Sequence, residues 1–435
     1  MVVLGLLACL IFGFGLLSRR LDGTVVSAPM VFVGAGLVAM WTGLVDFGSA
    51  THVEPETSRE VVFLVAELAL VLLLFADAAS IDPRHLRGNP LPVRLLGIGL
   101  PLTIGLGAVL ALVVLTELEP WECAIVAAVL APTDAALGQA VVSNPRVPVR
   151  VRQALNVEAG LNDGLSVPFL ALFLTLAVAE EELQPAGYWI RFALEQVGLG
   201  ALVGIGVGLV GGWLVRRASR KGWMAGPFQR LALLALALIA WALADQVGGN
   251  GFIAAFVGGL AAGPTVERVG GYLIRFTEAE GQLLNLSVFF VFGVLVVGLM
   301  GSFTWELALY ALLSLTLIRM LPVALSLIGT HLRSISVLFM GWFGPRGLAS
   351  IVLGLIVVAE APLLAGREEV EQVVALTVLF SVLLHGLTSA PLSAAYARRV
   401  DGMSAEAPEM RGAAEETTRM GRVKSRISEK PGATW

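Results

Sequence analysis

Five ionisable side chains lie within long apolar runs of the sequence: Asp134, Glu158, Asp163, Arg319 and Arg346. Charged groups are costly inside a bilayer, so such residues indicate a functional site. Each arginine can hold one carboxylate ionised by pairing, which leaves one carboxylate over. That carboxylate needs a proton or a bound monovalent cation to neutralise it. A site at which H⁺ and a cation compete is what an electroneutral exchanger requires.

The apolar runs contain two further acidic residues, an asparagine and a pair of glycines that bear on the site. Asp77 lies near the predicted cytoplasmic end of its apolar run, where solvent would reach it, and Glu67 lies deeper with no evident partner. Asn162 lies four residues after the glutamate of its own run and therefore shares that residue's helix face. Gly160 and Gly164 form a GxxxG motif, which favours the close approach of another helix and is typical of plain packing.

Proline stands beside a charge in two of the runs, in the segments Pro132-Thr133-Asp134 and Gly344-Pro345-Arg346-Gly347. Proline inside a helix removes a backbone hydrogen bond and leaves a carbonyl free. Such interruptions survive at membrane depth only where they are buried or line a cavity. These runs are the fifth and the twelfth, so they cross in opposite directions, as in inverted repeats with paired broken helices. We expect Asp134 and Arg346 to hold the crossed half-helices together.

The composition indicates a membrane protein as the scaffold for these residues. The chain is 57% hydrophobic and 14% charged, whereas soluble domains are roughly 45–50% apolar and 25% charged. This composition excludes a soluble enzyme and a disordered chain, and the net charge of −4 together with the absence of a long basic run excludes a nucleic-acid binder. Two cysteines and four scattered histidines give no disulfide framework and no metal spacing, so no cofactor is expected. We interpret His385 as a core histidine.

Thirteen runs are apolar and long enough to be membrane-spanning helices, which predicts an all-α polytopic membrane protein. They are residues 2–17, 25–45, 61–79, 93–115, 121–142, 151–178, 192–215, 230–246, 251–264, 282–300, 305–329, 335–359 and 372–397. The connections after odd-numbered runs, counted together with the first two residues of the run that follows, carry sixteen Lys or Arg residues, against three in the others. Because cytoplasmic loops collect Lys and Arg, the N-terminus is predicted to lie outside the cell membrane and the C-terminus in the cytoplasm.

Several motifs together resemble those of the NhaP-type monovalent cation/proton antiporters, which are related to eukaryotic sodium/proton exchangers. The motifs are APTDA at 131–135, EAGLND at 158–163, GFIAAFVGGLAAG at 251–263, GPRG at 344–347, and Arg319 in the eleventh run. The resemblance covers about residues 1–400. It implies an antiporter fold of thirteen helices, with two crossed broken helices, assembled as a homodimer.

The resemblance also implies how an ion is bound. Asp163 would be the ion- and proton-binding carboxylate, Asn162 its neighbour, and Thr133 a ligand to Na⁺ or K⁺ at the helix break. The family associates an Asn before this Asp with electroneutral one-for-one exchange. The chain has Ala159 and Ala135 where the family often has Ser and Pro. Na⁺ is the expected cation. Loss of the hydroxyl removes an oxygen ligand of the kind that hard cations prefer, so K⁺ and Li⁺ stay open as alternatives.

The remaining charges and the domains follow from the same resemblance. Glu158 would pair with Arg319, and Asp134 with Arg346, inside the core. Residues 1–90 and 228–301 would form interface helices, residues 91–180 and 302–398 core helices, residues 181–227 a linker helix, and residues 399–435 a cytoplasmic polar tail. We expect that tail to be solvated and disordered.

Three rival classes of protein also contain buried charges. A cation channel would show a pore loop or rings of charge. An intramembrane aspartyl protease would need Asp134 and Asp163 to share a proton. An organic-ion transporter would need cationic groups that remain unpaired. No Walker A sequence occurs, so a nucleotide-driven pump is unsupported. We expect no enzymatic activity. The expected partners are a monovalent cation, the proton, membrane lipid and a second copy of the chain, and no nucleic acid. The expected physiological role is pH homeostasis.

Overall fold

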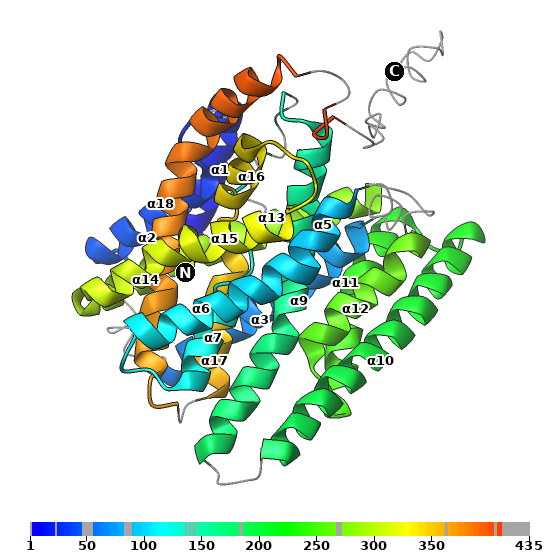
Figure 1. Ribbon diagram of the computed structural model, residues 1–435. Helices are drawn as coiled ribbons and strands as arrows, with labels where there is room; N and C mark the ends of the chain where they lie inside the picture. Colours follow the sequence, from blue (N-terminus) through cyan, green and yellow to red (C-terminus); the bar gives the residue numbers. More distant parts are fainter. Residues whose placement is uncertain are drawn as a thin grey trace.

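The computed structural model describes the greater part of the chain, and the regular elements in that part are helical (Figure 1). It describes residues 2–21, 24–45, 55–81, 89–134, 137–138, 141, 144, 146–181, 186–266, 272–361, 364–403 and 407–410. The all-α architecture predicted from the hydropathy pattern is therefore confirmed for these residues.

The first half of the chain supplies both long helices and short ones. They are α1 (Val2–Leu21), α2 (Ala28–Trp41), α3 (Pro55–Ser80), α5 (Pro90–Arg94), the π-helical η1 (Leu95–Gly99), α6 (Leu100–Val114), α7 (Pro120–Val129), α9 (Val149–Glu181) and α10 (Ala186–Arg220). The second half supplies α11 (Gly226–Gln246), α12 (Gly251–Val266), α13 (Tyr272–Leu299), the 3₁₀ turn η2 (Met300–Ser302), α14 (Trp305–Leu315), α15 (Leu317–Ser326), α16 (Ser334–Trp342), α17 (Leu348–Glu360) and α18 (Arg367–Val400).

These helices follow the thirteen predicted ranges in order. Among the described residues, eight helical stretches are long and apolar enough to cross a membrane, and shorter apolar helices include α2, α7, α12 and α17. Two of these shorter helices, α7 and α17, are halves of the interrupted runs that contain Pro132 and Pro345. The number of membrane crossings stays a prediction.

Local sequence explains where several helices begin. The Ser27 side chain accepts a hydrogen bond from the amide of Met30, and Thr304 accepts one from Leu307, so each caps a helix N-terminus. A reciprocal capping box of Glu119 and Glu122 begins α7. Proline follows each of the caps at Ser27 and Glu119, where its fixed φ suits the first helical turn.

Helices α10, α11 and α12 lie side by side at one edge of the molecule (Figure 1). Glycine residues determine how closely α10 approaches α12. Gly200, Gly204 and Gly208 recur at four-residue intervals and face the backbone of Asn250, Ala254 and Gly258. Such small-residue rows allow backbones to touch in membrane proteins. The linker helix expected at residues 181–227 thus packs along α12; the domain boundaries stay predictions.

Gly204→Ala should weaken this contact. A Cβ at this position would lie 2.5 Å from the carbonyl oxygen of Ala254, so the two helices must separate. Overpacking of this kind costs about 1–3 kcal/mol. Gly206 on the same helix faces open space, so Gly206→Ala should preserve or raise stability through helix propensity. Thermal unfolding of the purified variants measures the difference, and equal midpoints would contradict the packing argument.

The end of the chain differs in part from the solvated tail expected. Among the described residues after α18, the Glu409 carboxylate is fully buried and accepts hydrogen bonds of 2.9 Å from the Arg333 amide and the Ser336 hydroxyl. These groups lie at the start of α16, whose unpaired amide groups favour a carboxylate. The expectation for residues 411–435 lies outside the described residues.

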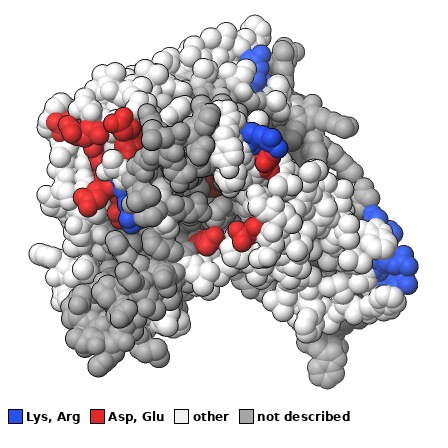
Figure 2. All heavy atoms as spheres, turned by 90° about the horizontal axis from the view of Figure 1, so that it is seen from below, with Lys and Arg blue, Asp and Glu red and all other residues white. Residues whose placement is uncertain are grey.

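Acidic side chains gather on the face seen from below in Figure 1, which Figure 2 shows directly. In Figure 1 this is the face at which α9 ends and α10 begins. The loop between these helices is one of those predicted to lie outside, because few Lys or Arg residues occur there. The orientation in the membrane stays a prediction.

Candidate functional site

The strongest ion pair of the site joins α9 to α15. Arg319 donates from Nη1 to Oε1 of Glu158 at 2.5 Å and from Nη2 to Oε2 at 2.9 Å. Both residues are 3% exposed. Arg319 enters α15 just after Thr316, where the backbone leaves helical geometry between α14 and α15. The resemblance implied this pair, and its bidentate geometry is the arrangement in which a buried pair compensates best for desolvation.

The two interrupted helices cross at their breaks. Helix α7 ends at Val129 and α16 at Trp342, and each is followed by non-helical backbone. The amide of Asp134 donates to the carbonyl of Pro345 at 2.7 Å, so the two breaks are bonded to each other. The Ser350 hydroxyl adds a bond of 2.8 Å to the carbonyl of Val129. The positions of both breaks agree with the interpretation of the prolines in the sequence.

Charged side chains neutralise the helix ends at this crossing. Arg346 donates from Nη1 to the carbonyls of Ala131 and Pro132, at 2.9 and 3.2 Å, just beyond the C-terminus of α7. The carboxylate of Asp134 accepts from the amide of Leu348 at 2.9 Å, at the N-terminus of α17. A cation at a helix C-terminus and an anion at an N-terminus are both favourable.

The direct Asp134–Arg346 pair that the resemblance implied stays a prediction. In the hydrogen bonds given by the structure, each charge binds backbone groups of the opposite broken segment. The interruptions leave carbonyls and amides without intrahelical partners, and these groups take up the charges. The two residues still join the crossed half-helices, as the sequence predicted.

Two buried oxygens beside this crossing lack protein hydrogen bonds. Asn162 donates from Nδ2 to the hydroxyl of Thr133 at 2.6 Å, which joins α9 to the broken segment. The Oδ1 atoms of Asn162 and Asp163 are buried without a hydrogen-bond partner. Buried polar atoms are normally satisfied, so such atoms require an explanation. Oxygens of a carboxylate, an amide and a hydroxyl can receive a hard monovalent cation, and the carboxylate can instead receive a proton.

Asp77 lies closer to this centre than its sequence position indicated. The carboxylates of Asp77 and Asp134 are near enough to interact electrostatically with Asp163. A Cβ built on Gly160 would lie 3.9 Å from the Cβ of Asp77, so α3 packs against the GxxxG face of α9. The GxxxG motif signalled a close neighbour, but nothing in the sequence identified α3 as that neighbour. Asp77 was therefore missed as a residue of the site.

Glu67, the acid with no evident partner in the sequence, makes a side-chain hydrogen bond with Trp241. This bond joins α3 to α11, outside the contacts of the broken segments described above.

Helix α18 holds the second broken segment through Ser381, which the sequence did not single out, and through His385. The Ser381 hydroxyl accepts from the amide of Arg346 at 2.6 Å. His385 lies one turn further, fully buried, with Nε2 2.9 Å from the carbonyl of Trp342. The interpretation of His385 as a core histidine agrees with this contact. The four-residue spacing of Ser381 and His385 was the signal available in the sequence.

Two interrupted helices cross in this structure, and beside the crossing lie a carboxylate oxygen and an amide oxygen that are buried without hydrogen bonds. This arrangement is typical of secondary transporters with broken helices. The family model described as "Sodium/hydrogen exchanger, transmembrane" matches residues 5–395. The chain belongs to this family, which confirms the resemblance seen in the motifs.

Relatives and solved structures agree with that membership. The chain is 28% identical over 400 residues to the K(+)/H(+) antiporter NhaP of Alkalimonas amylolytica, covering 90% of this chain and 66% of that protein. It is 27% identical over 374 residues to the Na(+)/H(+) antiporter ApNhaP of Aphanothece halophytica, covering 82% and 67%. It covers 52% of the K(+)/H(+) antiporter NhaP2 of Shewanella sp. (strain ANA-3), so it spans between about half and two thirds of these relatives.

The fold matches that of the sodium proton antiporter MjNhaP1 from Methanocaldococcus jannaschii, solved at pH 8. The TM-score is 0.75 at 18% sequence identity, and the match covers 92% of this chain and 99% of the other. The antiporter fold expected from the motifs is thus confirmed.

Proposed function

We propose that this protein is a secondary antiporter that exchanges protons for a monovalent cation across the cell membrane. The observation that carries the proposal is the buried Oδ1 of Asp163, which has no hydrogen-bond partner while neighbouring charges do. Glu158 is bound by Arg319, and Asp134 is bound by backbone amides. Asp163 is left to bind a proton or a cation in turn, which couples the two fluxes.

The transported cation would sit between Asp163, Thr133 and the amide oxygen of Asn162. Ala159 supplies no hydroxyl on this face of α9, so a water or a carbonyl must complete the oxygen shell. Relatives named as K(+)/H(+) and as Na(+)/H(+) antiporters are both similar to the chain. We propose Na⁺ as substrate, with K⁺ and Li⁺ as the alternatives.

A flux assay tests the proposal and the choice of cation together. Purified protein in liposomes with an internal pH-sensitive dye receives Na⁺, Li⁺ or K⁺ outside, at equal ionic strength. The proposal requires cation-dependent proton movement that liposomes without protein lack. Proton movement that is equal for choline and for all three cations would contradict it.

We also expect exchange to be electroneutral. Asp163 carries either one proton or one cation, and the Glu158–Arg319 pair stays intact in both states. Moving one net charge would couple transport to voltage by about 2.3 kcal/mol per 100 mV. A membrane potential clamped with valinomycin and K⁺ should therefore leave the Na⁺-driven proton flux unchanged. A steep dependence of the rate on this potential would indicate a second titrating carboxylate, for which Asp77 is the nearest candidate.

The arrangement of the protein in the membrane belongs to the same proposal. Interface helices would carry a homodimer contact, and the core helices would move against them to expose the site to each side in turn. The outer surface of α1 fits burial against lipid or a second copy, since Phe12 and Leu16 are each 70% exposed. The C-terminus would lie in the cytoplasm, and exchange would serve pH homeostasis.

A further inference from the structure

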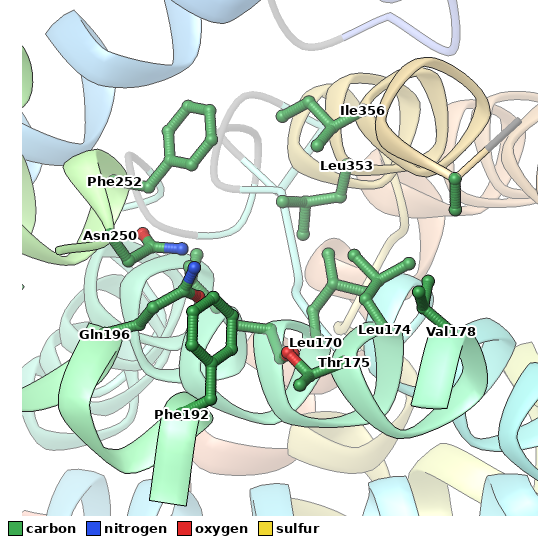
Figure 3. A pocket seen from close by; sticks show the side chains of 13 residues that line it. Leu170, Leu174, Thr175, Val178, Phe192, Gln196, Asn250, Phe252, Leu353 and Ile356 are labelled. Carbon is green, nitrogen blue, oxygen red and sulfur yellow. The ribbon is translucent and has the colours of Figure 1, made fainter. Parts of the chain in front are cut away.

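A cavity of about 190 Å³ lies one helical turn away from the candidate ion site (Figure 3). Its walls come from α9, α10 and α17, together with the residues that begin α12. Figure 3 shows Thr175, Gln196 and Asn250 as the polar side chains among apolar ones that line it. The cavity has room for several water molecules, and its hydroxyl and amide groups can hydrogen-bond to them.

The position of the cavity relative to Asp163 follows from α9. Val167 lines the cavity and lies four residues beyond Asp163, which is about 6 Å along the helix axis. Thr175 lies two further turns along the same helix. The cavity therefore begins about one turn of α9 beyond Asp163 and extends toward the C-terminal end of this helix. The charge pattern of the loops predicts that this end of α9 lies outside the cell.

One aromatic ring of α12 lines the cavity, and a second lies against the turn of α9 that carries Asp163. Phe252 lines the cavity and is 7% exposed. Phe256, one turn further along α12, is 5% exposed, and its ring occupies the space in which a Cβ of Gly164 would lie. Because Gly164 directly follows Asp163, the Phe256 ring lies against the helix turn that carries the ion-binding carboxylate.

We propose that this cavity is the outer vestibule that admits the hydrated monovalent cation, and that Phe256, seated on Gly164, closes the path to Asp163. The inference rests on the proposed function, which it deepens by naming the route and the residue that closes it. Among the described residues that line the cavity, none carries a charge. Neutral oxygens can replace part of a hydration shell without holding the cation so tightly that it cannot leave.

The physical basis of closure is the cost of moving an ion through an apolar layer. A cation loses its hydration between two phenylalanine rings, and no oxygen there replaces the lost water. Glycine at position 164 lets the ring approach the α9 backbone closely enough to exclude water. Opening then requires α12 and α9 to part or slide, a movement that packed helices make as a unit.

Two glycine substitutions test the closure. Gly164→Ala places a methyl group in the position of the Phe256 ring, so the closed state cannot form, and exchange should fall at least tenfold. Gly206→Ala on α10 is the control, because its methyl group meets no atom within 4 Å, and it should retain exchange within about twofold. The double variant Gly164→Ala, Phe256→Ala removes the overlap but also the ring that closes the path, so it should regain thermal stability without regaining exchange. Equal rates for Gly164→Ala and Gly206→Ala, or recovery of exchange in the double variant, would overturn the proposal.

Cysteine labelling tests the vestibule even if Gly164→Ala does not fold. Cys9 and Cys123 are first replaced by serine, after which Thr175→Cys is introduced as the only thiol. A membrane-impermeant methanethiosulfonate added from the outer face should modify this thiol and slow exchange, while the same reagent inside should not. Unreactive Thr175→Cys in an exchanging protein would refute the vestibule alone. Absence of exchange in the unsubstituted protein would instead refute the proposed antiport.

Discussion

Asp163→Asn is expected to abolish cation/proton exchange and to leave the protein folded. The amide matches the carboxylate in size but can neither carry the transported proton nor neutralise a cation. Three of the charges around the crossing are held by protein groups: Arg319 by Glu158, Asp134 by the amide of Leu348, and Arg346 by backbone carbonyls. These three groups are therefore not expected to substitute for the lost carboxylate. Exchange in proteoliposomes should fall to the level of liposomes without protein.

The control for this experiment removes a carboxylate of the same kind from the surface. Asp401 follows α18 and is exposed, so Asp401→Asn should exchange like the unsubstituted protein. Thermal unfolding in detergent should also separate the two variants. Na⁺ or K⁺ that binds the folded state raises its unfolding temperature by mass action. This shift should disappear for Asp163→Asn and persist for Asp401→Asn. Substantial exchange by Asp163→Asn would remove the central claim.

The helix breaks could be predicted from the sequence because their cause is local. Pro132 and Pro345 each remove a backbone donor wherever they occur in a helix, and a charge beside each indicated that the freed groups have a use. Hydropathy likewise indicated the helical runs, since the thickness of the bilayer sets the length that an apolar segment needs to cross it. These features need no knowledge of which helices are neighbours.

The partners of the site residues depend on tertiary packing, so most of them could not be predicted from the sequence. Asp77 and Asp163 are far apart in the sequence, and they approach because α3 packs against Gly160 of α9. Arg346 binds the carbonyls of Ala131 and Pro132, a choice set by the angle at which the broken segments cross. A count of charges showed that one carboxylate must be left over; only the geometry shows the uncompensated oxygen of Asp163.

Glu158→Ala and Arg319→Ala should each reduce both stability and exchange strongly. Removal of one partner leaves the other as an uncompensated buried charge, which typically costs about 3–5 kcal/mol. Arg319→Ala also frees a carboxylate within the core, where it can take up a proton or a cation that should bind Asp163. Unfolding midpoints and proton flux measured on the same preparations test both effects.

The double variant Glu158→Ala, Arg319→Ala distinguishes a true pair from two independent losses. Once both charges are gone, no isolated charge remains buried, so the double variant should be less destabilised than the two single variants added together. The exposed Arg191–Glu195 pair on α10 is the matched control, since Arg191 donates to Glu195 at 2.7 Å but both side chains face solvent. Glu195→Ala should leave the unfolding midpoint unchanged, because screened surface pairs contribute little. Strict additivity at positions 158 and 319 would mean that the ion pair does not hold α9 and α15 together, and that another contact aligns Asp163 with the crossed helices.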